Sequence, residues 1–181
     1  MNLPNALSLV RIFLVPVLVV FVIAVPGPYD LMAACVFLAA VLTDWLDGRI
    51  ARRMQQVTAL GKLLDPIADK LLISASLISL VQVGRVPAWI VVLIVGRDLA
   101  MTGLRAIAAA QNVIIQASEF GKATMTAEVI AVSLLILNRP TVALPLGWSL
   151  GQWALLLAMA LSLYSGMRYF LQFWRCIDLD K

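Results

Sequence analysis

The stretch VLTDWLDGRIARRMQ (residues 41–55) ends a long apolar run and carries two aspartates and three arginines with no polar spacer before them. An apolar run of about 20 residues has the length of a membrane helix. Asp44 and Asp47 are three positions apart, so they share one face of that helix. Acids inside or beside a bilayer are costly and usually functional. The stretch therefore predicts a membrane helix that carries a functional site at its end.

The composition indicates a membrane protein with several spans. Of the 181 residues, 62% are hydrophobic and 13% are charged, against about 45–50% and roughly 25% in soluble domains. This length suits one helical domain covering residues 1–181. Cys35 and Cys176 lie far apart and form no CxxC, which argues against a disulfide framework or a zinc site. The chain has no histidine, so its chemistry must use carboxylates, lysines, arginines and hydroxyls.

Six apolar segments predict an all-α integral membrane protein, a bundle of six transmembrane helices. They cover approximately residues 6–25, 30–50, 63–83, 87–109, 119–138 and 144–172. Three connections, PGPYD (26–30), QVGRVP (82–87) and NRPTVALPLG (138–147), contain the proline and glycine typical of turns. The connections 52–62 and 110–120 are more polar. The N-terminus has no basic region and no A-x-A site, which favours a retained helix over a signal peptide.

The basic residues predict the orientation of the bundle. Arg85 and Arg139 fall in the connections after the third and fifth segments, and the other twelve of the fourteen lysines and arginines lie on or near the opposite side. Basic residues concentrate on the cytoplasmic side of membrane proteins. We therefore expect a multi-pass protein of the cell membrane, with both termini and residues 52–62 in the cytoplasm.

Two further aspartates should face the first pair. Gly61, Asp65 and Asp69 follow one another at steps of four, which places them on one face of the next helix if Pro66 lies in its first turn. Four convergent carboxylates repel one another unless cations neutralise them. Oxygen ligands without histidine or cysteine favour Mg²⁺ or Mn²⁺, and we expect two such ions. The alternative is a helix junction in which Arg49, Arg52 and Arg53 pair with the acids.

The spacing D44-x2-D47-G48-x2-A51-R52-x8-G61-x3-D65-x3-D69 resembles, at every fixed position, the signature of the CDP-alcohol phosphotransferases. The opening NLPNALSLVRIFLVP, the stretch GRDLAMTGLR (96–105) and the six-helix layout are similar to members that use glycerol 3-phosphate. The resemblance implies an enzyme of phospholipid biosynthesis. It would transfer the phosphatidyl group of CDP-diacylglycerol to sn-glycerol 3-phosphate and release CMP. It also implies a homodimer.

The resemblance also implies roles for the residues of the signature. Asp44, Asp47 and Asp65 would bind metal, and Asp69 would share a second metal and act as the catalytic base. The nucleotide would be bound by Gly48, Ala51, Arg52 and Gly61. The acceptor is itself a phosphate ester and needs fixed cations near the metals. The candidates are Arg97, Arg105 and Lys122, because an arginine at depth normally faces a cavity or a partner.

Several alternatives remain open. Arg97 could pair with Asp98 or Glu128, and Arg105 and Lys122 could be basic anchors on the cytoplasmic side. Arg11 could be such an anchor or could reach the acceptor site, and we interpret it as an anchor or a structural residue. Members that use glycerol 3-phosphate usually have G-K-x-K-T, whereas GKATMTAE has Thr124 at the second lysine. Phosphatidylglycerol, an inositol phosphate or serine is therefore an alternative acceptor. A transporter with buried acids is a distant alternative, since no repeat is visible.

Overall fold

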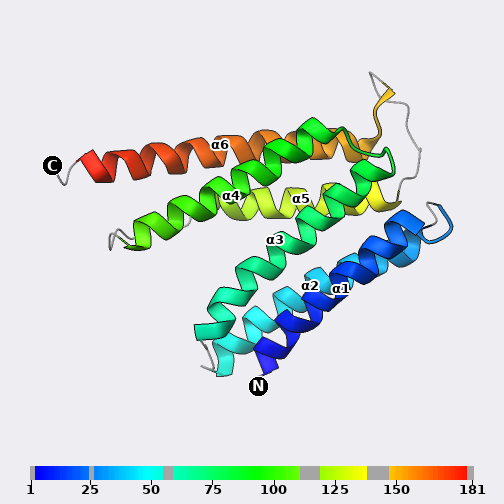
Figure 1. The fold of residues 1–181 in the computed structure, drawn as a ribbon, viewed down its shortest axis with the longest axis horizontal. Helices are drawn as coiled ribbons and strands as arrows, with labels where there is room; N and C mark the ends of the chain where they lie inside the picture. The colour runs from blue at the N-terminus through cyan, green and yellow to red at the C-terminus, as the bar shows by residue number, and fades with distance from the viewer. Residues whose placement is uncertain (1–2, 25–26, 55–58, 111–118, 138–146, 179–181) are drawn as a thin grey trace.

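The computed structural model describes the backbone of residues 3–24, 27–54, 59–110, 119–137 and 147–178. Within those ranges, the side chains of residues 3–7, 44–54, 59–66, 110, 119–120, 122 and 175–178 are outside the description. The described part contains six helices and no strand, which confirms the expected all-α class (Figure 1). The helices are α1 (Leu3–Ala24), α2 (Asp30–Met54), α3 (Ala59–Gln82), α4 (Ala88–Ala110), α5 (Glu119–Leu137) and α6 (Leu150–Asp178).

The helix boundaries differ from the expected ones around the aspartate signature. The expected polar connection 52–62 is mostly helical, because α2 continues to Met54 and α3 begins at Ala59. The expectation that Pro66 lies in a first turn is wrong, since α3 begins seven residues earlier. Proline inside a helix removes one backbone donor and is tolerated where packing outweighs that loss. All four aspartates of the signature therefore lie on helices, two on α2 and two on α3.

The six helices form two arms that meet at one end and separate at the other. In one arm α1 packs on α2 and α3, and in the other α6 packs on α4 and α5. Figure 1 shows the arms converging near the turns that precede α2, α4 and α6. The first residues of α1 and the last residues of α6 lie at the separated ends. We call the converging side the closed end and the other side the open end.

Polar contacts hold the closed end together. Arg85, in the turn between α3 and α4, donates through Nη2 to both carboxylate oxygens of Asp30 at 2.8 and 2.9 Å. Its Nη1 donates to the carbonyl of Ile136 at 2.7 Å, and Gln152 donates to the Arg85 carbonyl at 3.0 Å. Gly84, with φ of 72°, provides the left-handed residue of this turn. One arginine thus connects the start of α2, the end of α5 and the start of α6.

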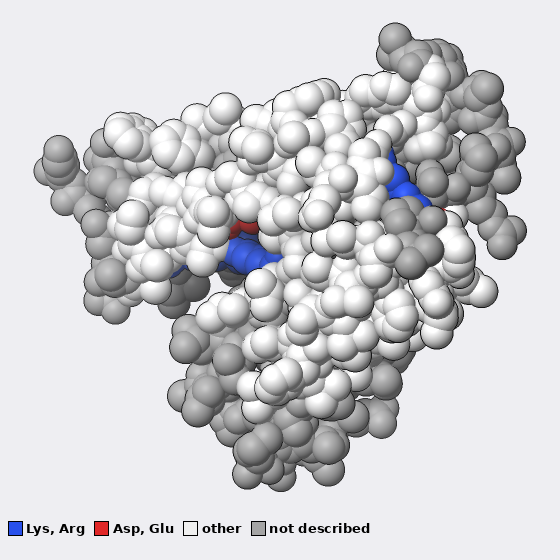
Figure 2. Space-filling view, turned by 45° about the vertical axis from the view of Figure 1, so that its right-hand side comes forward, with Lys and Arg blue, Asp and Glu red and all other residues white. Residues whose placement is uncertain are grey.

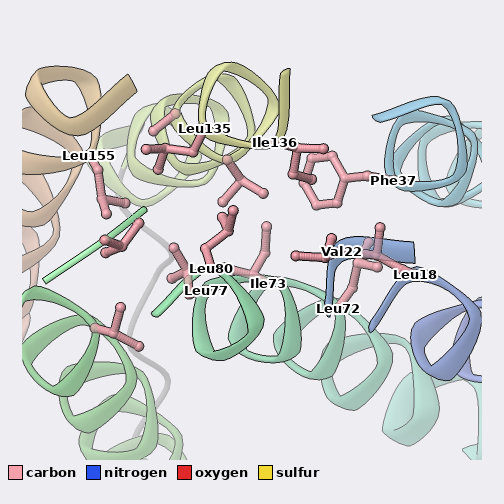
Figure 3. Packing of buried hydrophobic residues seen from close by; sticks show 14 of the residues in the cluster. Leu18, Val22, Phe37, Leu72, Ile73, Leu77, Leu80, Leu135, Ile136 and Leu155 are labelled. Atoms are coloured by element: carbon pink, nitrogen blue, oxygen red, sulfur yellow. The ribbon is translucent and has the colours of Figure 1, made fainter. Parts of the chain in front are cut away.

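Apolar side chains fill the junction between the arms. Leu77 and Leu80 of α3 are completely buried, and they meet Ile136 of α5 and Leu155 of α6 (Figure 3). Phe37 of α2 is equally buried and closes the other side of the cluster (Figure 3). Because α3 contributes to this cluster and also runs to the open end, packing at the closed end sets the position of its polar residues.

The outer surface of the bundle is also apolar. Large exposed hydrophobic side chains lie on every helix, for example Phe13 on α1, Leu42 on α2, Ile78 on α3, Val92 on α4, Ile130 on α5 and Leu157 on α6. Within the described residues, one segment, Leu150–Trp174, is long and apolar enough to cross a bilayer by itself. The segments Ser8–Ala24, Asp30–Thr43 and Ala123–Leu137 are apolar but shorter. A surface of this kind is typical of an interaction with lipid or with another protein.

Candidate active site

A cavity of about 210 Å³ lies between α3, α4 and α5, and most of the residues that line it are polar or charged. Its walls are formed by Asp69, Lys70 and Ile73 of α3, Arg97, Asp98 and Arg105 of α4, and Gly121, Thr124, Met125 and Glu128 of α5. Figure 2 shows basic and acidic atoms in a recess of a surface that is otherwise largely uncharged. The cavity therefore gathers charge between the arms, where the surrounding helices are apolar.

Asp69, the last aspartate of the signature, is held in the cavity wall by Arg11 of α1. Nη1 of Arg11 lies 2.7 Å from Oδ1 of Asp69, and the exposed fractions of the two side chains are 0% and 27%. The interpretation of Arg11 as an anchor at the surface is wrong because its side chain is completely buried, and its ion pair with Asp69 brings it to the wall of the cavity. A buried arginine requires an acidic partner, and this rule could have identified Arg11 from its place in an apolar run.

Lys70 is a cavity residue that sequence analysis did not identify. Its Nζ donates to the carbonyl of Asp98 at 3.1 Å and contacts the hydroxyl of Thr102. Among the described residues, Lys70 has no carboxylate at ion-pair distance. These contacts attach α3 to α4 through neutral oxygens, so the positive charge of Lys70 remains available to an anion in the cavity. Its place next to Asp69 is the signal that could have suggested this role.

Arg97 faces the same cavity and has the structural partner that sequence analysis named as an alternative. Its Nη1 lies 2.8 Å from Oδ1 of Asp98, and both side chains are 17% exposed. Within the described part, the Nε of Arg97 is buried and has no hydrogen-bond partner. Arg97 therefore uses only part of its donor set within the protein, and the buried Nε calls for a further acceptor.

The helix α6 provides the surface on which both candidate arginines of α4 rest. A Cβ atom at Gly166 would lie 3.2 Å from both Cγ and Nε of Arg97, closer than most such contacts, so a larger residue would require the arginine to shift by a few tenths of an ångström. Three residues further, on the same face of α6, the ring of Tyr169 lies 5.6 Å from the Cζ of Arg105. This distance is within the range of a cation–π interaction. Neither residue was identified from the sequence, because the contacts depend on how α6 packs against α4.

The structure thus brings together three of the site residues expected from the sequence: Asp69, Arg97 and Arg105. Thr124, at the position of the family's second lysine, is buried in the same wall. The other expected residues lie on helices whose backbone is described, but their side chains are outside the described part. They are Asp44, Asp47, Gly48, Ala51 and Arg52 on α2, Gly61 and Asp65 on α3, and Lys122 on α5.

Comparison with known proteins agrees with the resemblance seen in the sequence. Residues 1–164 match the family model "CDP-alcohol phosphatidyltransferase". A Bacillus subtilis protein named CDP-diacylglycerol–glycerol-3-phosphate 3-phosphatidyltransferase is 38% identical, with 99% of each chain covered. A Pseudomonas fluorescens protein of the same name is 33% identical over 99% of this chain and 94% of its own.

A further relative is named for a different activity. A rice protein named cardiolipin synthase (CMP-forming) is 32% identical over 98% of this chain and 59% of its own length. All these relatives match along almost the whole chain, and the family model covers both the aspartate signature and the cavity. The chain belongs to the CDP-alcohol phosphatidyltransferase family.

Proposed function

We propose that this enzyme transfers the phosphatidyl group of CDP-diacylglycerol to sn-glycerol 3-phosphate and releases CMP. The observation that carries the proposal is the cavity in which Lys70, Arg97 and Arg105 lie beside Asp69. Fixed cations next to a carboxylate suit an acceptor that has a phosphate and a reactive hydroxyl. The names of the Bacillus and Pseudomonas relatives support the same acceptor.

Phosphatidylglycerol is the second candidate acceptor, because the rice relative is named a cardiolipin synthase. An inositol phosphate also carries a phosphate for the three cations, but its ring requires more space than a glycerol chain. Serine offers one carboxylate and a positive ammonium group in place of a phosphate, so it matches the cations of the cavity less well. The charge of the cavity therefore favours a phosphorylated acceptor, and its volume of about 210 Å³ favours a small one.

The donor set of the signature fits divalent cations, which the family resemblance implies. It consists of carboxylates alone, the hard oxygen ligands that Mg²⁺ and Mn²⁺ prefer, and Asp69 presents a partly exposed carboxylate in the cavity wall. We propose that Asp44, Asp47 and Asp65 hold metal and that Asp69 shares a second ion. The ions would supply charge neutralisation at the diphosphate of the donor. Gly48, Ala51, Arg52 and Gly61 would bind the nucleotide.

The chemical step then needs positioning and one proton transfer. A hydroxyl oxygen of the acceptor forms a bond to the phosphorus of the phosphatidyl group, and the bond from that phosphorus to the oxygen of CMP breaks. Asp69 accepts the proton of the attacking hydroxyl, and the ion pair with Arg11 fixes the position of its carboxylate. Arg97, Arg105 and Lys122 orient the acceptor through its phosphate. Correct positioning supplies much of the rate enhancement in reactions of this kind.

We propose that all six helices cross the membrane, with both termini and the open end in the cytoplasm. The exposed apolar side chains on every helix support this arrangement. The distribution of the basic residues in the sequence supports it too, because twelve of the fourteen are expected on or near the cytoplasmic side. Water-soluble glycerol 3-phosphate would then enter the cavity from the cytoplasm, while the acyl chains of the donor stay in the bilayer. The family resemblance also supports a homodimer.

The orientation can be tested by labelling single cysteines in a Cys-free background of intact cells. We expect an impermeant reagent to label position 28 or 84, at the closed end, and not position 56. Labelling at 56 but not at 84 would place the cavity on the outer face and contradict the proposal.

The activity itself is tested by CMP release from CDP-diacylglycerol with each acceptor in turn. We expect turnover with sn-glycerol 3-phosphate in Mg²⁺ or Mn²⁺, and loss of turnover in Asp44→Ala, Asp47→Ala and Asp65→Ala because each removes a metal ligand. Faster release with phosphatidylglycerol would assign the second candidate activity. Full turnover in excess EDTA would contradict the metal site.

The contact between Gly166 and Arg97 gives a prediction about the acceptor. A methyl group in Gly166→Ala must displace Arg97, so we expect the KM for glycerol 3-phosphate to rise roughly tenfold, in the same direction as in Arg97→Ala. The control is Gly151→Ala, also on α6, where the added Cβ would lie 2.9 Å from Cγ of Leu135. That overpacking should cost about 1–3 kcal/mol of stability and leave the KM unchanged. A similar KM change in both variants would show that Arg97 has no specific role.

A further inference from the structure

Glu128 of α5 is a buried acid that neither the aspartate signature nor the acceptor cations explain. Its side chain is 5% exposed, and it lines the cavity together with Asp69 and Arg97. Within the described part of the chain, its Oε1 atom is buried and has no hydrogen-bond partner. Buried polar atoms in proteins nearly always have a partner, and one without a partner destabilises the fold. Glu128 therefore lines the cavity with a carboxyl group that has no ion-pair partner among the described residues.

Arg97, which lines the same cavity, does not supply that partner. Among the described ion pairs, Arg97 is paired with Asp98 and not with Glu128, and its stem lies against Gly166 of α6. The Nε of Arg97 is itself buried without a partner. Arg97 and Glu128 thus line the same cavity from α4 and α5 without pairing with each other. A ligand that carries both an anionic oxygen and a hydroxyl group could contact both side chains at once.

We propose that Glu128 accepts a hydrogen bond from the C2 hydroxyl of the acceptor, and that it selects acceptors with a second hydroxyl beside the reacting one. This inference rests on the proposed function. Glycerol 3-phosphate has two hydroxyls, and the one on C1 gives its proton to Asp69 on α3. The C2 hydroxyl takes no part in the reaction, and Glu128 lies on a different wall of the cavity. Sites built to bind a substrate hydroxyl reject analogues that lack it, because the polar group of the site then stays unpaired.

The test compares two acceptors in the complete enzyme, sn-glycerol 3-phosphate and 3-hydroxypropyl phosphate, which lacks only the C2 hydroxyl. In the unchanged enzyme we expect kcat/KM for CMP release to favour glycerol 3-phosphate by roughly 10- to 100-fold. Glu128→Met keeps the shape of the side chain without its polar atoms, so the preference should fall to about threefold or less, mainly through the loss with glycerol 3-phosphate. Glu128→Gln keeps an oxygen acceptor and should retain most of the preference.

Stability provides the second readout. Replacing an unpaired buried polar group by an apolar group of similar shape is often neutral or stabilising, so the Tm of Glu128→Met should be no lower than that of the unchanged enzyme. Ser133→Ala, on the same helix but outside the cavity, removes a hydroxyl that bonds only to its own helix and should change neither Tm nor preference.

The outcomes separate this inference from the proposed function. If Glu128→Met lowers kcat/KM equally for both acceptors, or if the unchanged enzyme shows no preference, Glu128 does not bind the C2 hydroxyl. A large fall in Tm with the preference retained would make Glu128 a structural residue. CMP release from neither acceptor would overturn the proposed function, and the role of Glu128 with it.

Discussion

The ion pair between Arg11 and Asp69 joins the first helix to the part of the third helix that lines the cavity. A completely buried arginine is tolerated in an apolar bundle only when an acid compensates its charge, and removal of one partner from such a pair is strongly destabilising. The pair therefore constrains two things at once. It fixes where α1 lies on α3, and it fixes the direction of the carboxylate that the proposed reaction uses as a base. Neither partner can be changed independently of the other.

The two ends of the bundle have different physical tasks. At the closed end the apolar cluster around Leu77 and Leu80 and the contacts of Arg85 hold the arms together. At the open end the arms separate, and the space between them is lined by charges that each arm alone would expose. Charges in a low-dielectric surrounding act strongly on a ligand and cost free energy when it is absent. Separating the stable end from the charged end lets the chain accommodate both.

Much of this arrangement could be predicted from the sequence, because it depends on patterns between residues close together in the chain. Apolar runs of sufficient length predicted six helices, and spacings of three and four placed the aspartates on helix faces before any tertiary contact was known. Asp69 was predicted from its spacing in the signature, and Arg97 and Arg105 were predicted as cations for the acceptor's phosphate, because an arginine at depth normally faces a cavity or a partner. All three line one cavity. The side chains of Asp44, Asp47 and Asp65 lie outside the described part, so their roles stay predictions.

The residues that could not be predicted act across helices. Gly166 resembles any other small helix residue until α6 packs against Arg97, and Tyr169 is an ordinary aromatic until Arg105 lies over its ring. The sequence named Glu128 only as a possible partner of Arg97, and the pairing of Arg97 with Asp98 left it without that role. The position of Pro66 was also mistaken, because helix boundaries depend on packing as much as on local signals. Sequence patterns therefore identified the chemistry, whereas the fold determined the positions.

A double-mutant cycle on kcat tests whether Arg11 acts on the reaction through Asp69. Four proteins are compared in CMP release at saturating acceptor: the unchanged enzyme, Arg11→Met, Asp69→Asn and the double variant. If Arg11 positions the base, each single change should remove most of the rate, and the double variant should be little slower than Asp69→Asn. Thermal unfolding of the same proteins separates loss of rate from loss of fold. Rate losses that multiply in the double variant would show that the two residues act independently, and would contradict the account.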